Sequence, residues 1–322
     1  MIGSCQHKDS NLLTLNKAMW RFVQLTDIHL ASMVDGEWNN RFLCTMMPDI
    51  ISCLRRDLAR LNPDFMLVTG DIASQHTRDA VFAARDLLDS LGVPYYPAGG
   101  NHDFLVRDSR KWFLEAYASR LPEEDTVYSF THKGLHFCVL DPWWKWRDNS
   151  LCPFSDKSIV DIMDVSVRGA RWALPPHQFG WLEDDLSEYA DLPTVIAVHY
   201  PLVPVPKRMR RPGFKDAGHL DNGNMVLRLL ARHPQVKAVF SGHMHMHFIE
   251  RRDGIAHVVT GSMPEFPCEY RDVRVYDDRI EVHTCGLSDG TFATRSLIDA
   301  NDWTAGESQD RTASVPLIED RG

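Results

Sequence analysis

Five short, largely apolar runs are separated by longer mixed segments along this chain. They cover residues 22–25, 65–68, 95–98, 195–198 and 236–240. Each run is followed by glycine or by polar residues. A short apolar run bounded by turn residues is typical of a buried strand. The pattern therefore predicts five buried β-strands.

Segments with apolar residues at helical spacing lie between these runs. Helices are expected over residues 48–61, 77–91, 109–120, 177–189 and 222–232. Gly92 ends the second of them, and Asp221 is a candidate N-cap of the last. Strands that alternate with helices favour parallel pairing through helical crossovers.

From residue 126 onward the chain becomes richer in strand patterns. Residues 127–131 and 135–140 predict a hairpin, and residues 248–251, 255–260, 273–276 and 280–284 predict further short strands. Arg252-Asp253-Gly254 is a typical hairpin turn. Residues 141–176 are expected to form a long irregular insertion. Two strand-rich halves with helices outside predict two sheets packed face to face.

Each of the five buried strands leads into residues that are able to bind a metal. In chain order these are Asp27 and His29, then Asp71, then Asn101, His102 and Asp103, then His199, and finally His243 and His245. In an open α/β sheet, ligands bind beyond the carboxyl ends of the strands. We therefore expect these side chains, far apart in sequence, to converge at one site.

Composition and charge narrow the class of protein. The chain has 322 residues and a formal net charge of −9, which argues against a general nucleic-acid-binding surface. Seven cysteines form no Cys-x-x-Cys pair and fit a reducing compartment. No apolar run has the length of a secretory signal or a membrane span, so we expect a cytoplasmic protein without a membrane partner.

The span of the candidate residues favours one domain. We place it at residues 18–285, preceded by an N-terminal tail at 1–17. Residues 286–322 are polar and poorly periodic, and we expect this C-terminal extension either to wrap the surface or to stay mobile.

The blocks Asp-x-His, Gly-Asp, Gly-Asn-His-Asp, His and Gly-His-x-His occur in that order between residues 21 and 262. This series resembles the calcineurin-like metallophosphoesterase superfamily, and most closely its bacterial branch of cyclic-nucleotide-phosphodiesterase type (class III). One block alone would be a weak signal, whereas five in order, each after a strand, are specific. The resemblance implies an α/β (α+β) fold, a four-layer αββα sandwich of two mixed β-sheets flanked by helices.

The resemblance also implies roles for the nine residues. Asp27, His29 and His245 are expected to bind a first metal ion, and Asn101, His199 and His243 a second, with Asp71 bridging both. His102 is expected to protonate the leaving group, and Asp103 to orient the His102 ring. A histidine suits this role because its ordinary pKa lies near neutrality.

The residue types fit phosphate ester hydrolysis. Phosphoryl oxygens are anionic, and two divalent ions roughly 3.5–4 Å apart neutralise them and acidify a bound water. Two ions, two aspartates and a bridging hydroxide sum to about +1, which favours an anionic substrate. A site of histidine, aspartate and asparagine accommodates Mn, Fe, Zn or Co, and the sequence does not choose among them.

Each candidate also has an ordinary structural explanation. Asp27, Asp71 or Asp103 could cap a helix, Asn101 could occupy a turn, and His199 could be a hydrogen-bonded core histidine. His247 and His257 are expected to be packing or surface residues. The same holds for His76 and His219, although both lie in loops that could reach the site.

The leading hypothesis is a two-metal phosphodiesterase acting on cyclic nucleotides or glycerophosphodiesters through a metal-bridging hydroxide, with His102 as general acid. The alternatives are a broad phosphomonoesterase and, less favoured, a nuclease or a non-catalytic scaffold. Two segments are candidates for substrate contacts, the tryptophan-rich residues 143–147 and the basic residues 207–211. A packed insertion and a solvated loop are their structural alternatives. A homo-oligomer is compatible with the sequence.

Overall fold

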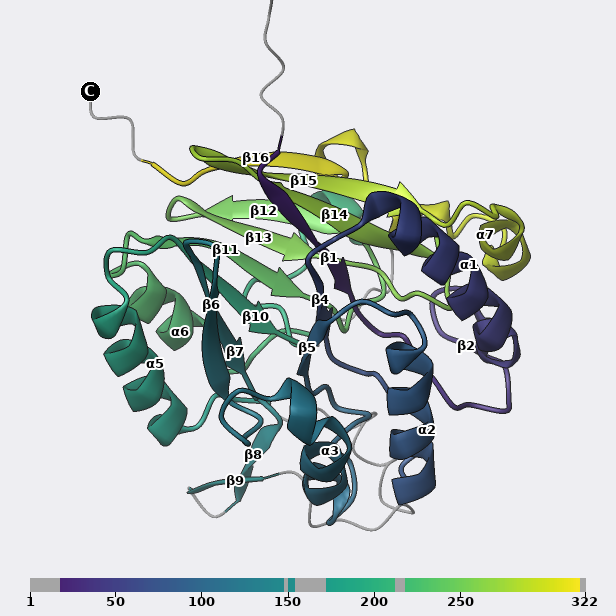
Figure 1. Ribbon diagram of the computed structural model, residues 1–322, viewed down its shortest axis with the longest axis horizontal. Helices are drawn as coiled ribbons and strands as arrows, with labels where there is room; N and C mark the ends of the chain where they lie inside the picture. Colours follow the sequence, from purple (N-terminus) through teal and green to yellow (C-terminus); the bar gives the residue numbers. More distant parts are fainter. Residues whose placement is uncertain (1–17, 148–149, 154–171, 212–217, 319–322) are drawn as a thin grey trace, which may run out of the picture.

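The computed structural model describes residues 18–147, 150–153, 172–211 and 218–318. The expected N-terminal tail and half of the expected insertion therefore lie outside the described residues. Two six-stranded sheets form the centre, as Figure 1 shows. The fold prediction of two mixed sheets flanked by helices is confirmed.

One sheet has the strand order β16-β15-β14-β1-β4-β5, and the other has the order β12-β13-β11-β10-β7-β6. The strands of the first are β1 (Trp20–Leu25), β4 (Phe65–Thr69), β5 (Tyr95–Ala98), β14 (Glu269–Val275), β15 (Arg279–Gly286) and β16 (Thr312–Pro316). Those of the second are β6 (Tyr128–His132), β7 (Leu135–Leu140), β10 (Thr194–Val198), β11 (Val236–Ser241), β12 (Phe248–Arg252) and β13 (Ile255–Val259). All five buried strands predicted from the apolar runs are present.

The sheets pack face to face through aromatic side chains. Phe22 of β1 lies with its ring centroid 5.5 Å from that of Phe137 on β7 and 5.7 Å from that of Phe240 on β11. Phe65 of β4 lies 5.5 Å from Phe137. All four rings are fully buried, and burying such a side chain contributes about 1.5–3 kcal/mol to folding.

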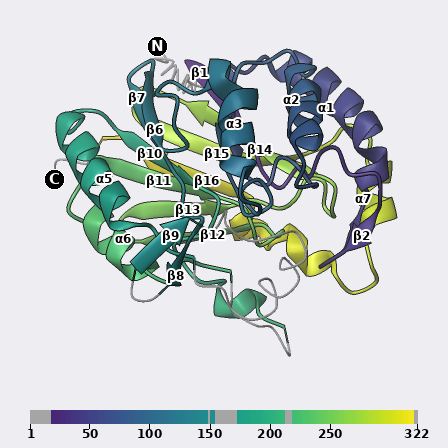
Figure 2. The ribbon, with the colours of Figure 1, turned by 90° about the horizontal axis from the view of Figure 1, so that it is seen from below.

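The helices cover the outer faces of the two sheets. They are α1 (Met47–Leu61), α2 (Arg78–Asp89), α3 (Ser109–Tyr117), α5 (Pro176–Glu188), α6 (Gly223–Leu230) and α7 (Thr291–Ser296). Figure 2 shows α1 and α2 on one side of the molecule and α5 and α6 on the other, with the strands between them. Of these six α-helices in the described part of the chain, five were expected from their spacing.

Helix α6 does not begin as predicted. Asn222, not Asp221, is its N-cap residue, and no side chain caps the helix. The Asn222 side chain is used elsewhere, because its Oδ1 accepts a hydrogen bond from Leu174 N and its Nδ2 donates to Leu174 O. The Asn222 side chain thus bonds to backbone groups distant in sequence instead of capping its own helix.

Strands β1, β4 and β5 run parallel, and so do β7, β10, β11 and β13. Their carboxyl ends therefore lie at one edge of each sheet. A bridge between Leu30 and Ala73, and hydrogen bonds from Asp27 N to Gly70 O and from His29 N to Asp71 O, join the loops that follow β1 and β4. This edge is where the candidate site is built.

The insertion differs from the irregular structure that was expected for it. The insertion includes a hairpin of β8 (Trp144–Arg147) and β9 (Ser150–Pro153), so it is not irregular throughout. Trp143, at its start, is buried and stacks at 3.7 Å on Trp172. This contact favours the packing explanation for Trp143.

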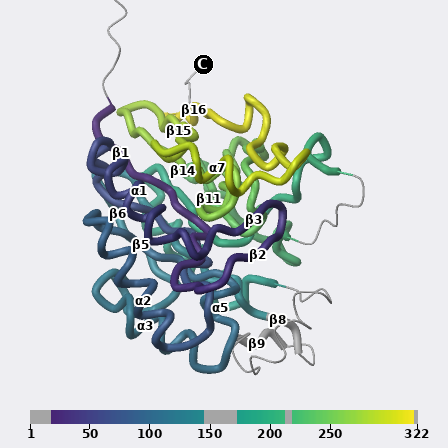
Figure 3. The backbone as a smooth tube through the Cα atoms, turned by 90° about the vertical axis from the view of Figure 1, so that its right-hand side faces the viewer, coloured from purple at the N-terminus to yellow at the C-terminus, as the bar shows by residue number. Residues whose placement is uncertain are grey.

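The C-terminal extension joins the fold over its described part. Helix α7 and strand β16 follow residue 286, and β16 pairs antiparallel with β15 at the edge of the first sheet. Figure 3 shows this segment, in yellow, beside β15. The predicted boundary at residue 285 stays a prediction, but these residues contribute a strand to the sheet.

Short elements complete the described chain. A ribbon of β2 (Gly36–Glu37) and β3 (Arg41–Phe42) follows β1. The 3₁₀ turns are η1 (Cys44–Met46), η2 (Ala118–Arg120), η4 (Lys207–Met209), η5 (Asp302–Ala305) and η6 (Ser308–Asp310). Within the described ranges, no helix has both the length and the apolar composition needed to cross a bilayer.

Candidate metal centre

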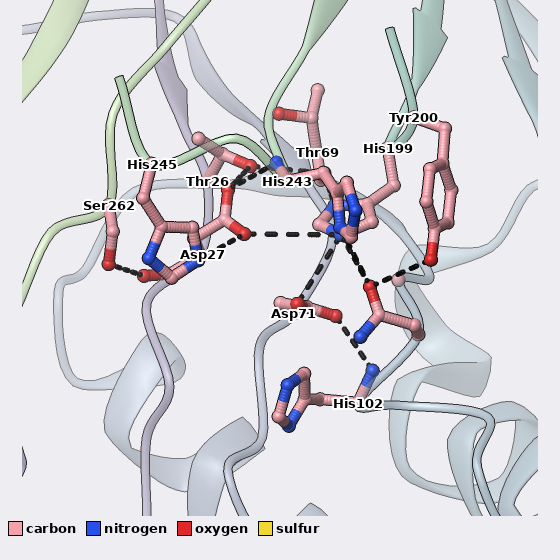
Figure 4. Close-up of polar contacts among 12 residues, drawn as sticks. Thr26, Asp27, Thr69, Asp71, His102, His199, Tyr200, His243, His245 and Ser262 are labelled. Atoms are coloured by element: carbon pink, nitrogen blue, oxygen red, sulfur yellow. Dashed lines mark hydrogen bonds and ion pairs between the residues drawn. The ribbon is translucent and has the colours of Figure 1, made fainter. Parts of the chain in front are cut away.

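The seven predicted metal ligands come together at the carboxyl ends of five strands. Asp27, His29, Asp71 and His245 place potential ligand atoms within 4.8 Å of one another. Asp71, His199 and His243 form a second such group. Asp71 belongs to both groups, and Figure 4 shows it between the two sides of the pocket.

Asn101 completes the second group. Its Oδ1 lies 3.1 Å from His199 Nε2 and 3.0 Å from His243 Nδ1. The Tyr200 hydroxyl donates a hydrogen bond to the same oxygen at 3.2 Å, which fixes the amide. Each strand end therefore supplies a side chain to one pocket, as the sequence predicted.

The backbone at this pocket is held in an uncommon conformation. Asp27, His29, Asp71, His243 and His245 all have positive φ angles, between 48° and 66°. Such angles cost of order 1–3 kcal/mol each in non-glycine residues, and they cluster at functional sites. The neighbouring Gly70 has a φ of 96°, and a Cβ there would overlap the His199 ring. This strain directs five side chains into one space.

Hydrogen bonds from buried groups orient the imidazole rings. His199 Nδ1 donates to Thr69 O at 2.8 Å, and His245 Nδ1 lies 2.6 Å from Glu265 Oε2. In each ring this leaves Nε2 facing the pocket, and metal-binding histidines are commonly oriented in this way. Glu265 is fully buried, and its other oxygen accepts a hydrogen bond from Asn40 N.

Two carboxylates provide the negative charge of the pocket. Asp27 Oδ2 accepts hydrogen bonds from Thr26 Oγ1 and His243 N, at 2.7 and 2.9 Å. Its Oδ1 is buried and lies 3.1 Å from His245 Nε2. Asp71 Oδ1 accepts a hydrogen bond from His102 N, and its Oδ2 lies 3.3 Å from His199 Nε2.

The pKa values divide these groups into two kinds. Burial opposes ionisation of Asp27, but the charges of His245 and His199 outweigh it and lower the pKa of Asp27 to about 2. Burial is likewise outweighed for Asp71, whose pKa falls well below its ordinary value beside His199 and His102. Both aspartates are therefore anionic near neutral pH.

The histidines respond according to their distance from these carboxylates. Burial lowers the pKa of His29 and of His243 to about 3, so both rings are neutral. For His245, burial is outweighed by Asp27 and Glu265, and the pKa rises to about 10. The pKa of His199 rises to about 9 beside Asp71 and Asp27. Without bound cations, the protonated rings of His199 and His245 therefore balance the charges of Asp27 and Asp71.

This donor set fits a pair of divalent cations. His29 Nε2 and His245 Nε2 face each other at 3.4 Å, and Asp27 Oδ1 is buried 3.1 Å from His245 Nε2. Bound cations would satisfy both, because they replace the two protons and take electron pairs from nitrogen and oxygen. Imidazole, carboxylate and amide donors suit Mn, Fe, Zn and Co alike.

His102 and Asp103 lie next to the pocket but do not form the expected pair. Asp103 accepts hydrogen bonds from Ile72 N, Ala73 N and Gly100 N, at 2.9–3.2 Å. Among the described residues it makes no hydrogen bond to the His102 ring. The expectation that Asp103 orients this ring is corrected, because the carboxylate holds together the loops after β4 and β5.

The His102 ring lies 4.8 Å from the His29 ring, which places it at the edge of the first group. His76 lies in contact with it, since His76 Nδ1 is 2.8 Å from His102 O and the rings are 5.6 Å apart. Of the histidines with open roles, His76 therefore reaches the site. His247 and His257 are buried and belong to neither of these two groups, as expected for packing residues.

In the basic segment at 207–211, the charge of Arg208 is already paired with carboxylates. The Arg208 guanidinium contacts Glu250, Asp310 and Glu307. This arrangement gives Arg208 a structural explanation and leaves it no evident role as a phosphate clamp.

A family model described as calcineurin-like phosphoesterase matches residues 21–247. A probable cyclic nucleotide phosphodiesterase of Synechococcus is 29% identical over 81% of this chain and 90% of its own length. The glycerophosphodiester phosphodiesterase GpdQ of Enterobacter lignolyticus is 25% identical over 71% of this chain and 73% of its own length.

A 3',5'-cyclic-nucleotide phosphodiesterase of Nostoc is 25% identical over 72% of this chain and 74% of its own length. Among solved structures, a dimetal phosphatase from Danio rerio superposes with a TM-score of 0.64 at 19% identity. The superposition covers 84% of this chain and 97% of that one, and it supports the fold.

Proposed function

Because this chain belongs to the calcineurin-like phosphoesterase family and is therefore a metal-dependent phosphoric ester hydrolase, we propose that it hydrolyses small phosphodiesters at a two-metal centre. Cyclic nucleotides and glycerophosphodiesters are the candidate substrates, because the relatives' names specify them. The observation that carries the proposal is the place of Asp71, whose carboxylate belongs to both groups of potential ligand atoms.

The proposed ligand sets follow the two groups. Asp27, His29 and His245 would hold one ion, and Asn101, His199 and His243 the other, with Asp71 between them. The family uses a dinuclear divalent metal centre, which supplies positive charge for the phosphoryl oxygens and acidifies water.

The remaining residues orient this set. Thr69 O and Glu265 fix the rings of His199 and His245, and Tyr200 fixes the Asn101 amide. His102 is held at the pocket edge by its backbone bond to Asp71 and by the contact of His76 with its carbonyl. From this position its imidazole would carry the proton that the departing alkoxide requires.

A substrate panel tests the proposal. Metal-loaded protein is expected to hydrolyse cyclic AMP, glycerophosphoethanolamine and bis(p-nitrophenyl) phosphate with a larger kcat/KM than it hydrolyses the matching monoesters. The measurement is initial-rate kinetics on each ester at one pH. Faster hydrolysis of all the monoesters would instead identify a broad phosphomonoesterase.

The variant His102→Ala tests the proton donor. We expect kcat on alkyl esters to fall by about a hundredfold or more, within the range of general acid catalysis, while metal content is retained. Esters of p-nitrophenol should lose much less, because that leaving group departs without a proton. Equal losses on both kinds of ester would contradict a role as acid.

A further inference from the structure

The loop after β1 exposes an unusual amount of apolar surface. Among the described residues, six large apolar side chains are exposed, and Met33, Val34 and Trp38 lie within this one loop. Their exposed fractions are 80%, 71% and 52%. Exposed aromatic side chains beside a polar pocket are candidates for ligand contacts.

Trp38 is the member of this group that reaches the metal centre. Its ring centroid lies 4.6 Å from that of His245 and 6.1 Å from that of His243. Phe42 fills the space on the inner side, with its ring 5.1 Å from His245 and 5.2 Å from His29. The indole therefore stands next to the ligand residues while half of it stays open to solvent.

The loop is held in this position by backbone and buried polar contacts. Trp38 N donates to Asn40 O at 3.0 Å, and Asn39 Nδ2 donates to Met244 O at 3.1 Å. The Asn40 side chain is fully buried and donates to Asn301 O and Thr304 Oγ1, both at 3.2 Å. The indole is thus placed before a substrate arrives, which lowers the entropy that binding costs.

From these contacts we propose that Trp38 determines substrate specificity by stacking against the base of a nucleotide diester whose phosphate occupies the metal centre. The inference rests on the proposed function and selects nucleotides among its candidate substrates. A planar ring beside the ligands matches a nucleobase, which one ribose separates from the phosphate. An indole stacks well on any base, because every base has a π-face. A glycerol or ethanolamine group offers no such face.

Kinetics on two diesters test this assignment. In Trp38→Ala we expect the ratio of kcat/KM for cyclic AMP to kcat/KM for glycerophosphoethanolamine to fall by about tenfold, which is in the range of one lost base stack. The change should lie mainly in KM. Trp38→Phe should restore most of the ratio, since it keeps an aromatic face.

A matched control is Met225→Ala. Met225 is also an exposed apolar side chain, at 51%, but it lies on α6. Its removal should leave the ratio unchanged. Circular dichroism and metal content of each variant show whether the fold and the metal centre are intact.

Binding of AMP provides a readout that does not depend on turnover. AMP is expected to quench the tryptophan fluorescence of the metal-loaded protein, and Trp38→Phe should abolish this quenching while AMP still competes with substrate. Trp38→Ala should raise the Kd for AMP, measured by calorimetry, and leave the Kd for inorganic phosphate unchanged.

An unchanged ratio in Trp38→Ala would overturn the proposal, whether activity on the two diesters is retained or falls equally. If sedimentation also showed that the substitution converts a dimer to a monomer, the result would identify the segment around Trp38 as an interface between copies of the chain. Wild-type protein that hydrolyses no diester would refute the proposed function, and the AMP titration would still decide whether Trp38 contacts a base.

Discussion

Treatment with EDTA, followed by its removal, is expected to abolish hydrolysis of bis(p-nitrophenyl) phosphate, and added Mn²⁺ is expected to restore it. The reason is the charge of the pocket. Without cations it contains two anionic carboxylates, whose charge is balanced only by protons on His199 and His245. Such a pocket neither attracts a phosphate strongly nor activates water.

The measurement combines initial rates with metal analysis by mass spectrometry. Thermal unfolding serves as a control, because a ligand that binds only the native state raises the Tm. The metal-free protein should remain folded, since its aromatic core between the sheets does not involve the site, and Mn²⁺ should raise its Tm. Activity that persists in protein shown to be free of metal would refute a two-metal mechanism.

The variant Asp71→Asn is expected to lower kcat/KM by at least about a thousandfold on every ester. Metal ions stabilise transition-state charge by several kcal/mol, and each 1.4 kcal/mol corresponds to a factor of ten. Asp71 is the one residue that belongs to both donor groups, so the amide should weaken both metal sites. Metal stoichiometry should therefore fall together with activity.

Asp272→Asn is the matched control for this variant. Asp272 is another fully buried carboxylate, but it lies on β14 and accepts a hydrogen bond from Arg274 Nε at 2.9 Å. The substitution should lower stability without changing metal content or kcat/KM. Asp71→Asn protein with two bound ions and wild-type rates would show that Asp71 does not bridge the metals.

The buried strands and the convergence of the candidate ligands were predictable because both depend on local pattern. A run such as residues 65–68 is apolar on both faces, which predicts a strand covered on both sides. A residue such as Asp71 directly follows its strand, and parallel strands bring their carboxyl ends to one edge. Residue order alone therefore placed Asp71 and His199 in one pocket.

The residues that the sequence analysis missed act through long-range contacts. Glu265 lies 20 residues beyond His245 in a loop without a motif, and its role depends on how that loop folds back. Trp38 was missed for the same reason. A single exposed tryptophan between short strands carries no periodic signal, and only the structure places its ring beside His245.

The wrong predictions have a common cause. Asp103 and Asp221 were assigned by their place next to a histidine and next to a helix, respectively. In the structure, Asp103 holds the backbones of two loops, while Asn222, the actual N-cap residue of α6, bonds to Leu174 instead of capping the helix. Polar side chains have several possible partners, and the choice among them depends on tertiary structure.

The C-terminal extension contacts two segments that border the pocket. Thr304 O accepts a hydrogen bond from His247 N, two residues after His245, and Thr304 Oγ1 accepts one from Asn40 near Trp38. Asp310 accepts a hydrogen bond from Ile249 N and pairs with Arg208. A shortened version that stops at residue 285 would therefore remove the supports of both the segment after β11 and the segment that contains Trp38.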